Sequence, residues 1–287
     1  MNKEFLNIVK NFWDRKYKEF EHANIIKLSM MLFLFGEKLF DLNVNDQNFN
    51  KNGKELAKIY LKKTYQNLLS VIENILRKER EVKAVIHEMG YYYTQGPNDL
   101  FEILSQTFDL LKNNKNKVVY EMTIDLFNSS INQYLLGVET VLNNLDIVME
   151  KEFLLSMANN SLNIIQLLNS LIESIKDMNV LTENEINDFM KVRKIMMRIN
   201  RISQKSIITF VFNFLNELGN HFKTNSFISL DMTKILVSTN EIFGPYRQYM
   251  NSLVLKKSWN EILKMTLYHY CKIPKLFYIF YIYDKYI

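Results

Sequence analysis

Residues 54–89, KELAKIYLKKTYQNLLSVIENILRKEREVKAVIHEM, decide the fold class. Apolar residues in this stretch recur three and four positions apart, which places them on one broad face of an α-helix. The residues on this face are Leu56, Ile59, Tyr60, Leu68, Ile72, Ile75 and Leu76. Gly90 follows directly, and glycine tolerates the left-handed conformation common just past a helix C-terminus. The sequence therefore predicts one long amphipathic helix that ends at Gly90.

The same helical spacing of apolar residues continues through most of the chain. Its further segments are 5–40, 98–111, 118–149, 153–178, 183–222, 226–243 and 245–271. The 287 residues include only seven glycines and three prolines, too few for the frequent turns of a β-rich fold. Strict heptads do not persist, which favours short bundles over a two-stranded coiled coil. We predict an all-α fold of antiparallel helical bundles, with one bundle in 1–150, a second in 151–271, and a tail, 272–287, assigned to neither.

Local signals predict where several helices start and stop. Thr182 and Glu185 have the spacing of a capping box, in which each side chain satisfies a helix-start amide. After Pro97, Asn98 is predicted to cap the next helix and Asp99 to place negative charge in its first turn. Gly244-Pro245 is predicted to end another helix. Beyond it, we expect Tyr246, Tyr249, Met250, Leu253 and Leu263 to pack inward and Lys256, Lys257 and Lys264 to stay in solvent.

The net charge of +5 comes from lysines that are spread over the chain in runs of two at most. This pattern is typical of a solvated surface, so we expect no nucleic-acid partner. The single Cys271 rules out an internal disulfide. No apolar run reaches the roughly 20 residues of a membrane span, and no signal peptide is visible at the N-terminus. We expect a cytoplasmic protein that is soluble or peripheral to a membrane.

No catalytic motif is present in the sequence. The four histidines form no H-E-x-x-H, and a single E-x-x-H, Glu19 to His22, lacks the second motif that a di-metal bundle requires. Three consecutive tyrosines, Tyr91 to Tyr93, favour a loop wedged against a helix bundle over a platform for stacking bases. We predict that the protein is not an enzyme and uses no cofactor, metal or small-molecule substrate.

The stretch GYYYTQGPNDLF, residues 90–101, resembles a signature of the Sec-six subunit of the exocyst, a vesicle-tethering complex. The residues that fit this signature are Gly90, Tyr92, Thr94, Gly96, Pro97, Asp99, Leu100 and Phe101. Four further segments resemble that family in the same order: 53–79, 150–171 with its paired Asn159-Asn160, 210–229, and 241–271. Asn213 and Phe227 depart from the family pattern, where aspartate and tryptophan are usual. The usual N-terminal coiled coil is not seen, and 272–287 replaces the family's last bundle.

The resemblance implies an elongated rod of consecutive helical bundles. It also implies a scaffold that helps dock secretory vesicles at the plasma membrane before SNARE-mediated fusion. Other exocyst subunits and SNARE proteins are the partners it implies, with peripheral membrane association through the complex at secretion sites. The sequence leaves open one alternative from another functional class. This alternative is a generic all-α adaptor that binds nucleic acid or anionic membranes through its excess lysines.

Overall fold

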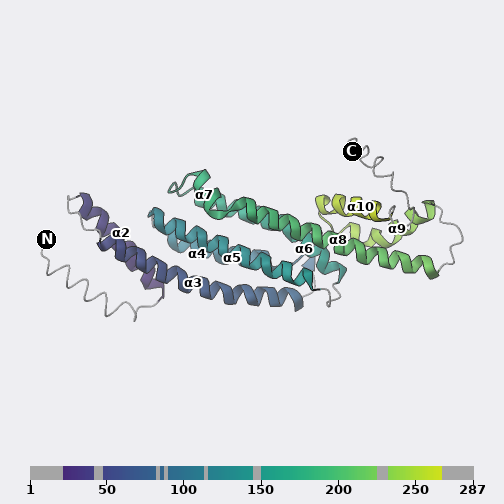
Figure 1. Ribbon diagram of the computed structural model, residues 1–287, viewed down its shortest axis with the longest axis horizontal. Coiled ribbons are helices and arrows are strands. Elements are labelled where there is room, and N and C mark those ends of the chain that lie inside the picture. Colours follow the sequence, from purple (N-terminus) through teal and green to yellow (C-terminus); the bar gives the residue numbers. More distant parts are fainter. Residues whose placement is uncertain are drawn as a thin grey trace. The chain divides into compact units, whose positions relative to one another are not determined.

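The computed structural model describes residues 22–41, 48–81, 85–86, 90–112, 116–144, 150–224 and 232–266. Nine helices form nearly all of this described part (Figure 1). They are α2 (His22–Asp41), α3 (Asn48–Glu81), α4 (Gly96–Leu111), α5 (Lys117–Asn143), α6 (Lys151–Lys176), α7 (Glu183–Met190), α8 (Val192–Thr224), α9 (Met232–Arg247) and α10 (Ser252–Thr266). The all-α prediction is confirmed.

The predicted helix 54–89 is wrong at its C-terminal end, because α3 ends at Glu81. Beyond it lie two strands of two residues each, β1 (Val85–Ile86) and β2 (Tyr92–Tyr93). They pair antiparallel, with Val85 opposite Tyr93 and Ile86 opposite Tyr92. Gly90 lies just before β2 with a φ of +90°, a conformation that L side chains rarely adopt. The glycine is therefore required, but for a turn that leads into a strand and not for a helix end.

Two other predicted helix boundaries also differ from the structure. Helix α4 begins at Gly96, which places Pro97 in the first turn, where its missing N–H would have no helical partner. Asn98 therefore lies inside the helix and is not its cap. Helix α9 continues through Gly244 and Pro245 to Arg247, so the predicted break falls a few residues too early. The predicted capping box of Thr182 and Glu185 is present at the start of α7.

The chain forms two compact units, each built from separate stretches of sequence. The first contains 1–74, 102–133 and 171–192, and the second contains 75–101, 134–170 and 193–287. The unit boundaries fall inside helices, among them α3, α5 and α6, which contribute residues to both units. The division at residue 150 and the elongated shape stay predictions.

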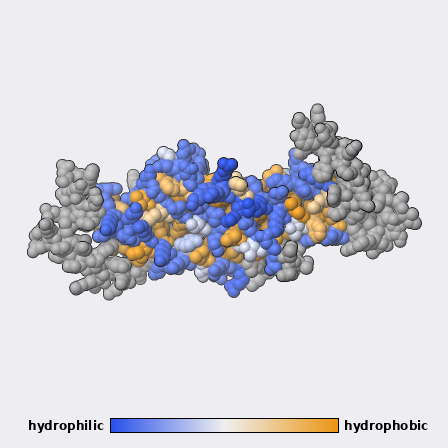
Figure 2. All heavy atoms as spheres, in the orientation of Figure 1, coloured by the Kyte–Doolittle hydropathy of each residue, from blue (hydrophilic) through white to orange (hydrophobic). Residues whose placement is uncertain are grey.

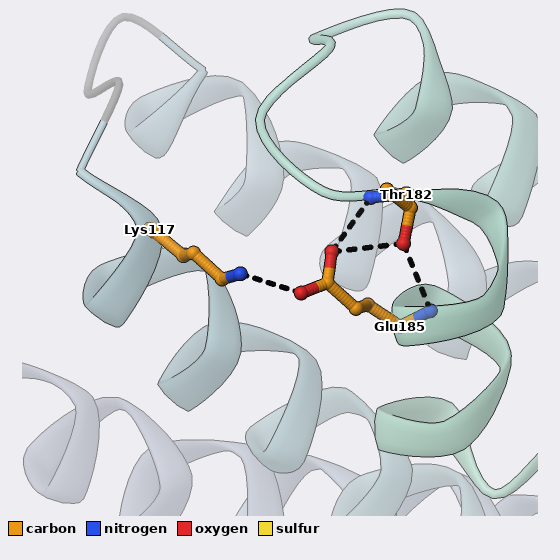
Figure 3. A network of polar contacts seen from close by, with 3 residues as sticks. All are labelled: Lys117, Thr182 and Glu185. Atoms are coloured by element: carbon orange, nitrogen blue, oxygen red, sulfur yellow. Dashed lines mark hydrogen bonds and ion pairs between the residues drawn. The ribbon is translucent and has the colours of Figure 1, made fainter.

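The core of the first unit is apolar and includes an aromatic group. The rings of Tyr120 and Phe127 lie 6.0 and 6.4 Å from the ring of Phe108 in edge-on geometry. At the start of α7 in the same unit, the Glu185 carboxylate accepts a bond from the Thr182 backbone N–H and pairs with the Lys117 ammonium (Figure 3). The ion pair connects α5 to α7 within this unit.

The core of the second unit contains a second aromatic group, made by α8, α9 and α10. The Phe243 ring lies 6.4 Å from Phe210, 6.0 Å from Phe214 and 5.4 Å from Trp259. Val254 and Ile262 of α10 are buried, and so is Met250, whose burial was predicted. Leu253 is 44% exposed, so its predicted inward position is wrong, and Lys256, Lys257 and Lys264 are exposed as predicted.

Hydrophilic residues cover much of the face drawn in Figure 2, and hydrophobic residues form separate patches between them. In the described part of the chain, no helix combines the length and the apolar character that crossing a membrane would demand.

Candidate functional site

The residues of the sequence signature all lie in the second unit. Thr94, Gly96, Pro97, Leu100 and Phe101 are buried, whereas Gly90, Tyr92 and Asp99 are half-buried. None of these eight residues is fully exposed. We call residues 90–101, which include β2 and the first residues of α4, the signature loop, and it bonds α3 and α6 as described below.

The acidic side chain of Glu79 lies at the centre of these contacts. It occupies the last turns of α3 and is only 6% exposed. The Thr94 hydroxyl donates to Glu79 Oε1 at 2.7 Å, and the Tyr134 hydroxyl of α5 donates to the same oxygen at 2.8 Å. Two donors from separate elements thus hold one buried carboxyl, which connects α3, α5 and the signature loop.

Gly96 is required at this position because of a close approach to Glu79. A Cβ atom built on Gly96 would lie 2.1 Å from Glu79 Oε1 and 3.0 Å from Ile75 Cγ2. Atoms that are not bonded cannot approach so closely, so any larger residue would displace the carboxyl from its two donors. The first glycine of the Gly96-Pro97 pair therefore leaves room for Glu79.

Asn160 of α6 binds Thr94 through two hydrogen bonds. The Thr94 backbone N–H donates to Asn160 Oδ1 at 3.2 Å, and Asn160 Nδ2 donates to the Thr94 hydroxyl at 2.6 Å. The Thr94 hydroxyl thus accepts from Asn160 and donates to Glu79, and so links α6 to α3. Nearby, Asn163 Nδ2 donates to Asn98 Oδ1 at 3.0 Å, which gives Asn98 a partner in place of the predicted capping role.

Asn159 connects the signature loop to the turn between α9 and α10. Its Nδ2 donates to the backbone oxygens of Tyr92, at 2.8 Å, and Tyr249, at 3.2 Å. Its Oδ1 accepts the Asn251 N–H at 3.1 Å. The Tyr92 N–H donates to the Tyr249 oxygen at 3.0 Å, and the two tyrosine rings lie 4.5 Å apart. We call Glu79, Thr94, Tyr134, Asn159 and Asn160 the polar lock.

Burial changes the acid–base properties of the polar lock. Removal from water raises the pKa of Glu79 from 4.5 to about 7, although the bonds from Thr94 and Tyr134 act in the opposite direction, and the charge of Asp99 raises it further. Burial and the neighbouring Glu79 carboxyl raise the pKa of Tyr134 well above 10, so the phenol keeps its proton to donate. The carboxyl is therefore neutral in acid and titrates near neutrality.

The geometry of the polar lock is suited to joining helices. Its side chains bond one another and the backbone within the unit. No group of three or more histidine, cysteine, aspartate or glutamate side chains is placed to hold a metal ion within the described ranges. The arrangement satisfies buried polar groups and fixes where five chain segments meet: α3, the signature loop, α5, α6 and the turn between α9 and α10.

The sequence predicted some of these residues and missed others. The family resemblance selected three segments separately: the signature loop, the Asn159-Asn160 pair and residues 241–271. The structure brings members of all three together. Glu79 and Tyr134 were missed. One signal could have found Glu79, because it follows Ile72, Ile75 and Leu76 on the same face of α3 and so puts a carboxyl at a core position.

Comparisons with known proteins agree with this fold. No curated protein matches the chain. The chain is similar to a solved structure described as the crystal structure of the C-terminal domain of the exocyst subunit Sec6p, with a TM-score of 0.59 and 13% identity. The match covers 76% of this chain and 62% of that one, so the chain spans less than two thirds of the solved domain. At this identity the likeness shows the fold alone.

The family comparison covers nearly the whole chain. The family model described as exocyst complex component Sec6 matches residues 2–275, a range that includes every residue of the polar lock. The chain belongs to the exocyst complex component Sec6 family.

Proposed function

We propose that this chain is a non-enzymatic scaffold subunit of the exocyst that helps dock secretory vesicles at the plasma membrane before SNARE-mediated fusion. The observation that carries the proposal is the family match over residues 2–275. The polar lock supports it, because the most distinctive residues of the signature loop bond other parts of the same unit. A scaffold needs helices held in fixed positions, and the lock holds them.

The proposed partners are the other exocyst subunits, with SNARE proteins as further partners. The proposed location is the cytoplasm, at secretion sites where the complex associates peripherally with the plasma membrane. Association between long helical subunits buries apolar surface, which salt screens little. Binding to RNA or anionic lipid would instead weaken steeply as salt rises, because released counterions drive it.

The test compares three binding partners for the purified chain over a range of salt concentrations: purified exocyst subunits, a single-stranded RNA, and vesicles containing phosphatidylserine. We expect association with at least one exocyst subunit that changes little between low and physiological salt. A variant with Lys256, Lys257 and Lys264 changed to glutamate should keep its fold, because surface substitutions change stability by about 0.5 kcal/mol or less. Strong, salt-steep RNA binding that this variant loses, together with no subunit association, would refute the proposal.

A further inference from the structure

Helix α8 has a solvent-facing side in the second unit that carries large apolar side chains. Met197, Ile208 and Phe212 are 59%, 37% and 54% exposed. They lie eleven and four residues apart, close to whole numbers of helical turns, so they share one side of the helix. Ile199 and Phe210, on the opposite side, are buried. Single exposed apolar residues are common on soluble proteins, but three in line form a stripe that the unit leaves uncovered.

The same side of α8 is basic in its first half. Arg193, Lys194 and Arg201 are exposed there. From position 193 to position 216 the sequence contains no aspartate or glutamate. We call the six residues of this side the α8 face: Arg193, Lys194, Met197, Arg201, Ile208 and Phe212.

Arginine is concentrated in this part of the chain. Three of the seven arginines of the protein, Arg193, Arg198 and Arg201, fall within nine residues, although lysine fills most basic positions elsewhere. Lysine gives a surface positive charge equally well, but the planar guanidinium of arginine binds a carboxylate through two parallel hydrogen bonds. The choice of arginine therefore points to carboxylates as the groups that meet α8.

One acidic residue of the chain, Glu139 of α5, neutralises part of this positive charge. Its carboxylate pairs with Arg198 Nε at 3.3 Å and lies 3.7 Å from Arg201 Nη1, so one carboxylate faces two guanidiniums. Among the described residues, no carboxylate pairs with Arg193 or Lys194. Both lie in the first turn of α8, where positive charge opposes the helix dipole, so helix stability does not account for them. The α8 face therefore keeps an excess of positive charge over the described carboxylates near it.

We infer that the α8 face binds an acidic amphipathic helix of a protein partner, which places carboxylates at the basic half of the face and apolar side chains on its apolar residues. This inference goes beyond the proposed scaffold role and depends on the face alone. Arginine, methionine and phenylalanine are enriched in protein–protein interfaces, and an amphipathic helix laid on an apolar surface is a common mode of recognition. Electrostatic membrane binding typically uses clusters of four to eight basic residues, more than this face offers.

The experiment measures the fluorescence anisotropy of a dye-labelled synthetic peptide in the presence of the full chain. The peptide has about 20 residues, because the α8 face spans about 29 Å of helix and a helical peptide of this length covers it. Its leucines are three and four positions apart, and its glutamates are concentrated in the first half, where negative charge stabilises a helix. Two matched peptides serve as controls: one has glutamine at every glutamate, and the other has serine at every leucine.

Each protein variant has a matched control on another helix. Arg193→Glu with Lys194→Glu is compared with Lys62→Glu with Lys63→Glu, which makes the same change in charge at two adjacent exposed positions of α3. Phe212→Ser is compared with Leu110→Ser, which removes an apolar side chain of similar exposure from α4. Circular dichroism and the unfolding midpoint check that each variant folds.

We expect the glutamate peptide to bind at least about tenfold more tightly than either control peptide. The double change at Arg193 and Lys194 should weaken this binding about tenfold or more, and so should Phe212→Ser. Both control variants should leave it within about twofold. Glutamates in the first turn favour the helix dipole, so the weaker binding of the α8 double variant would not come from loss of α8.

Three results would overturn the inference. The first is a glutamate peptide that does not bind, or that binds no more tightly than its controls. The second is equal weakening by the α8 and α3 double variants, which would indicate general charge attraction. The third is displacement of the peptide by phosphatidylserine vesicles or by RNA, either of which would assign the α8 face to a different class of ligand. None of these results bears on association with exocyst subunits, so the scaffold proposal is tested separately.

Discussion

At the scale of single residues, the burial of the Glu79 carboxyl creates an energetic conflict. A buried carboxylate is costly because it loses its hydration, and two neutral hydroxyl donors offset only part of that cost. The folded chain relieves the conflict by protonation, since the pKa of Glu79 rises from 4.5 to about 7. The side chain is therefore compatible with its site as a neutral acid, and ionisation opposes folding.

The first prediction concerns the pH dependence of stability. A carboxyl whose pKa is raised by folding contributes fully to the free energy of unfolding below about pH 4.5. This contribution is lost as the pH rises through about 7. The loss amounts to roughly 3 kcal/mol. Glu79→Gln has no proton to lose at this position, so it keeps its stability where wild type loses stability. The free energy of unfolding of the variant minus that of wild type should therefore increase by this amount as the pH rises between the two values. Urea unfolding at several pH values measures it.

The control for this prediction is Glu73→Gln, on an exposed position of the same helix. Its free energy of unfolding should follow that of wild type at every pH. Parallel curves for wild type and Glu79→Gln would show that Glu79 does not titrate as described.

The second prediction concerns the two glycines that precede prolines. Gly96→Ala places a methyl group against the Glu79 carboxyl and breaks its bonds to Thr94 and Tyr134, so it should destabilise the chain by about 1–3 kcal/mol. Gly244→Ala, inside α9, meets no atom within 4 Å apart from its chain neighbours, and the higher helix propensity of alanine is opposed by contact with the Pro245 ring, so the change in stability should stay below about 1 kcal/mol. Urea unfolding of both variants measures the contrast, and equal effects would contradict it.

At the scale of elements, the sequence predicted helices better than it predicted their ends. Apolar periodicity is local, so it predicted the segments that contain α3 to α10, but it gave 183–222 as one segment, which the structure divides into α7 and α8 at Lys191. The end of α3 depends instead on pairing of Val85 and Ile86 with Tyr92 and Tyr93, residues several positions further along the chain. Pro245 is tolerated in the last turn of α9, where losing one backbone bond does not stop the helix. The capping box was predicted correctly because its partners are three residues apart.

The third prediction concerns this capping box. Thr182→Ala removes the hydroxyl that accepts the Glu185 N–H, and it should lower the free energy of unfolding by about 1 kcal/mol. Thr140→Ala, at an exposed position inside α5, is the matched control and should change stability by less than about 0.5 kcal/mol. Guanidinium unfolding measures both, and a larger loss for Thr140→Ala would show that the cap contributes little.

At the scale of the whole molecule, the polar lock could not be predicted from local sequence patterns. Thr94 and Asn160 are 66 residues apart, and Asn159 and Asn251 are 92 apart, so no local spacing reveals that they meet. The family resemblance selected the segments, since it reflects residues that a shared fold requires, but it did not say which atoms bond. The structure supplies that information and gives the signature loop a physical role in holding the unit together.

The central proposal is that this chain is a scaffold subunit of the exocyst. Affinity isolation of the tagged full chain from its own cells tests this proposal most directly. Mass spectrometry would identify the proteins that accompany it. The account predicts that other exocyst subunits are recovered with wild type and with Gly244→Ala, and that Gly96→Ala, which disrupts the polar lock, recovers less of them. Isolation of wild-type chain without any exocyst subunit, under conditions in which those subunits recover one another, would contradict the account.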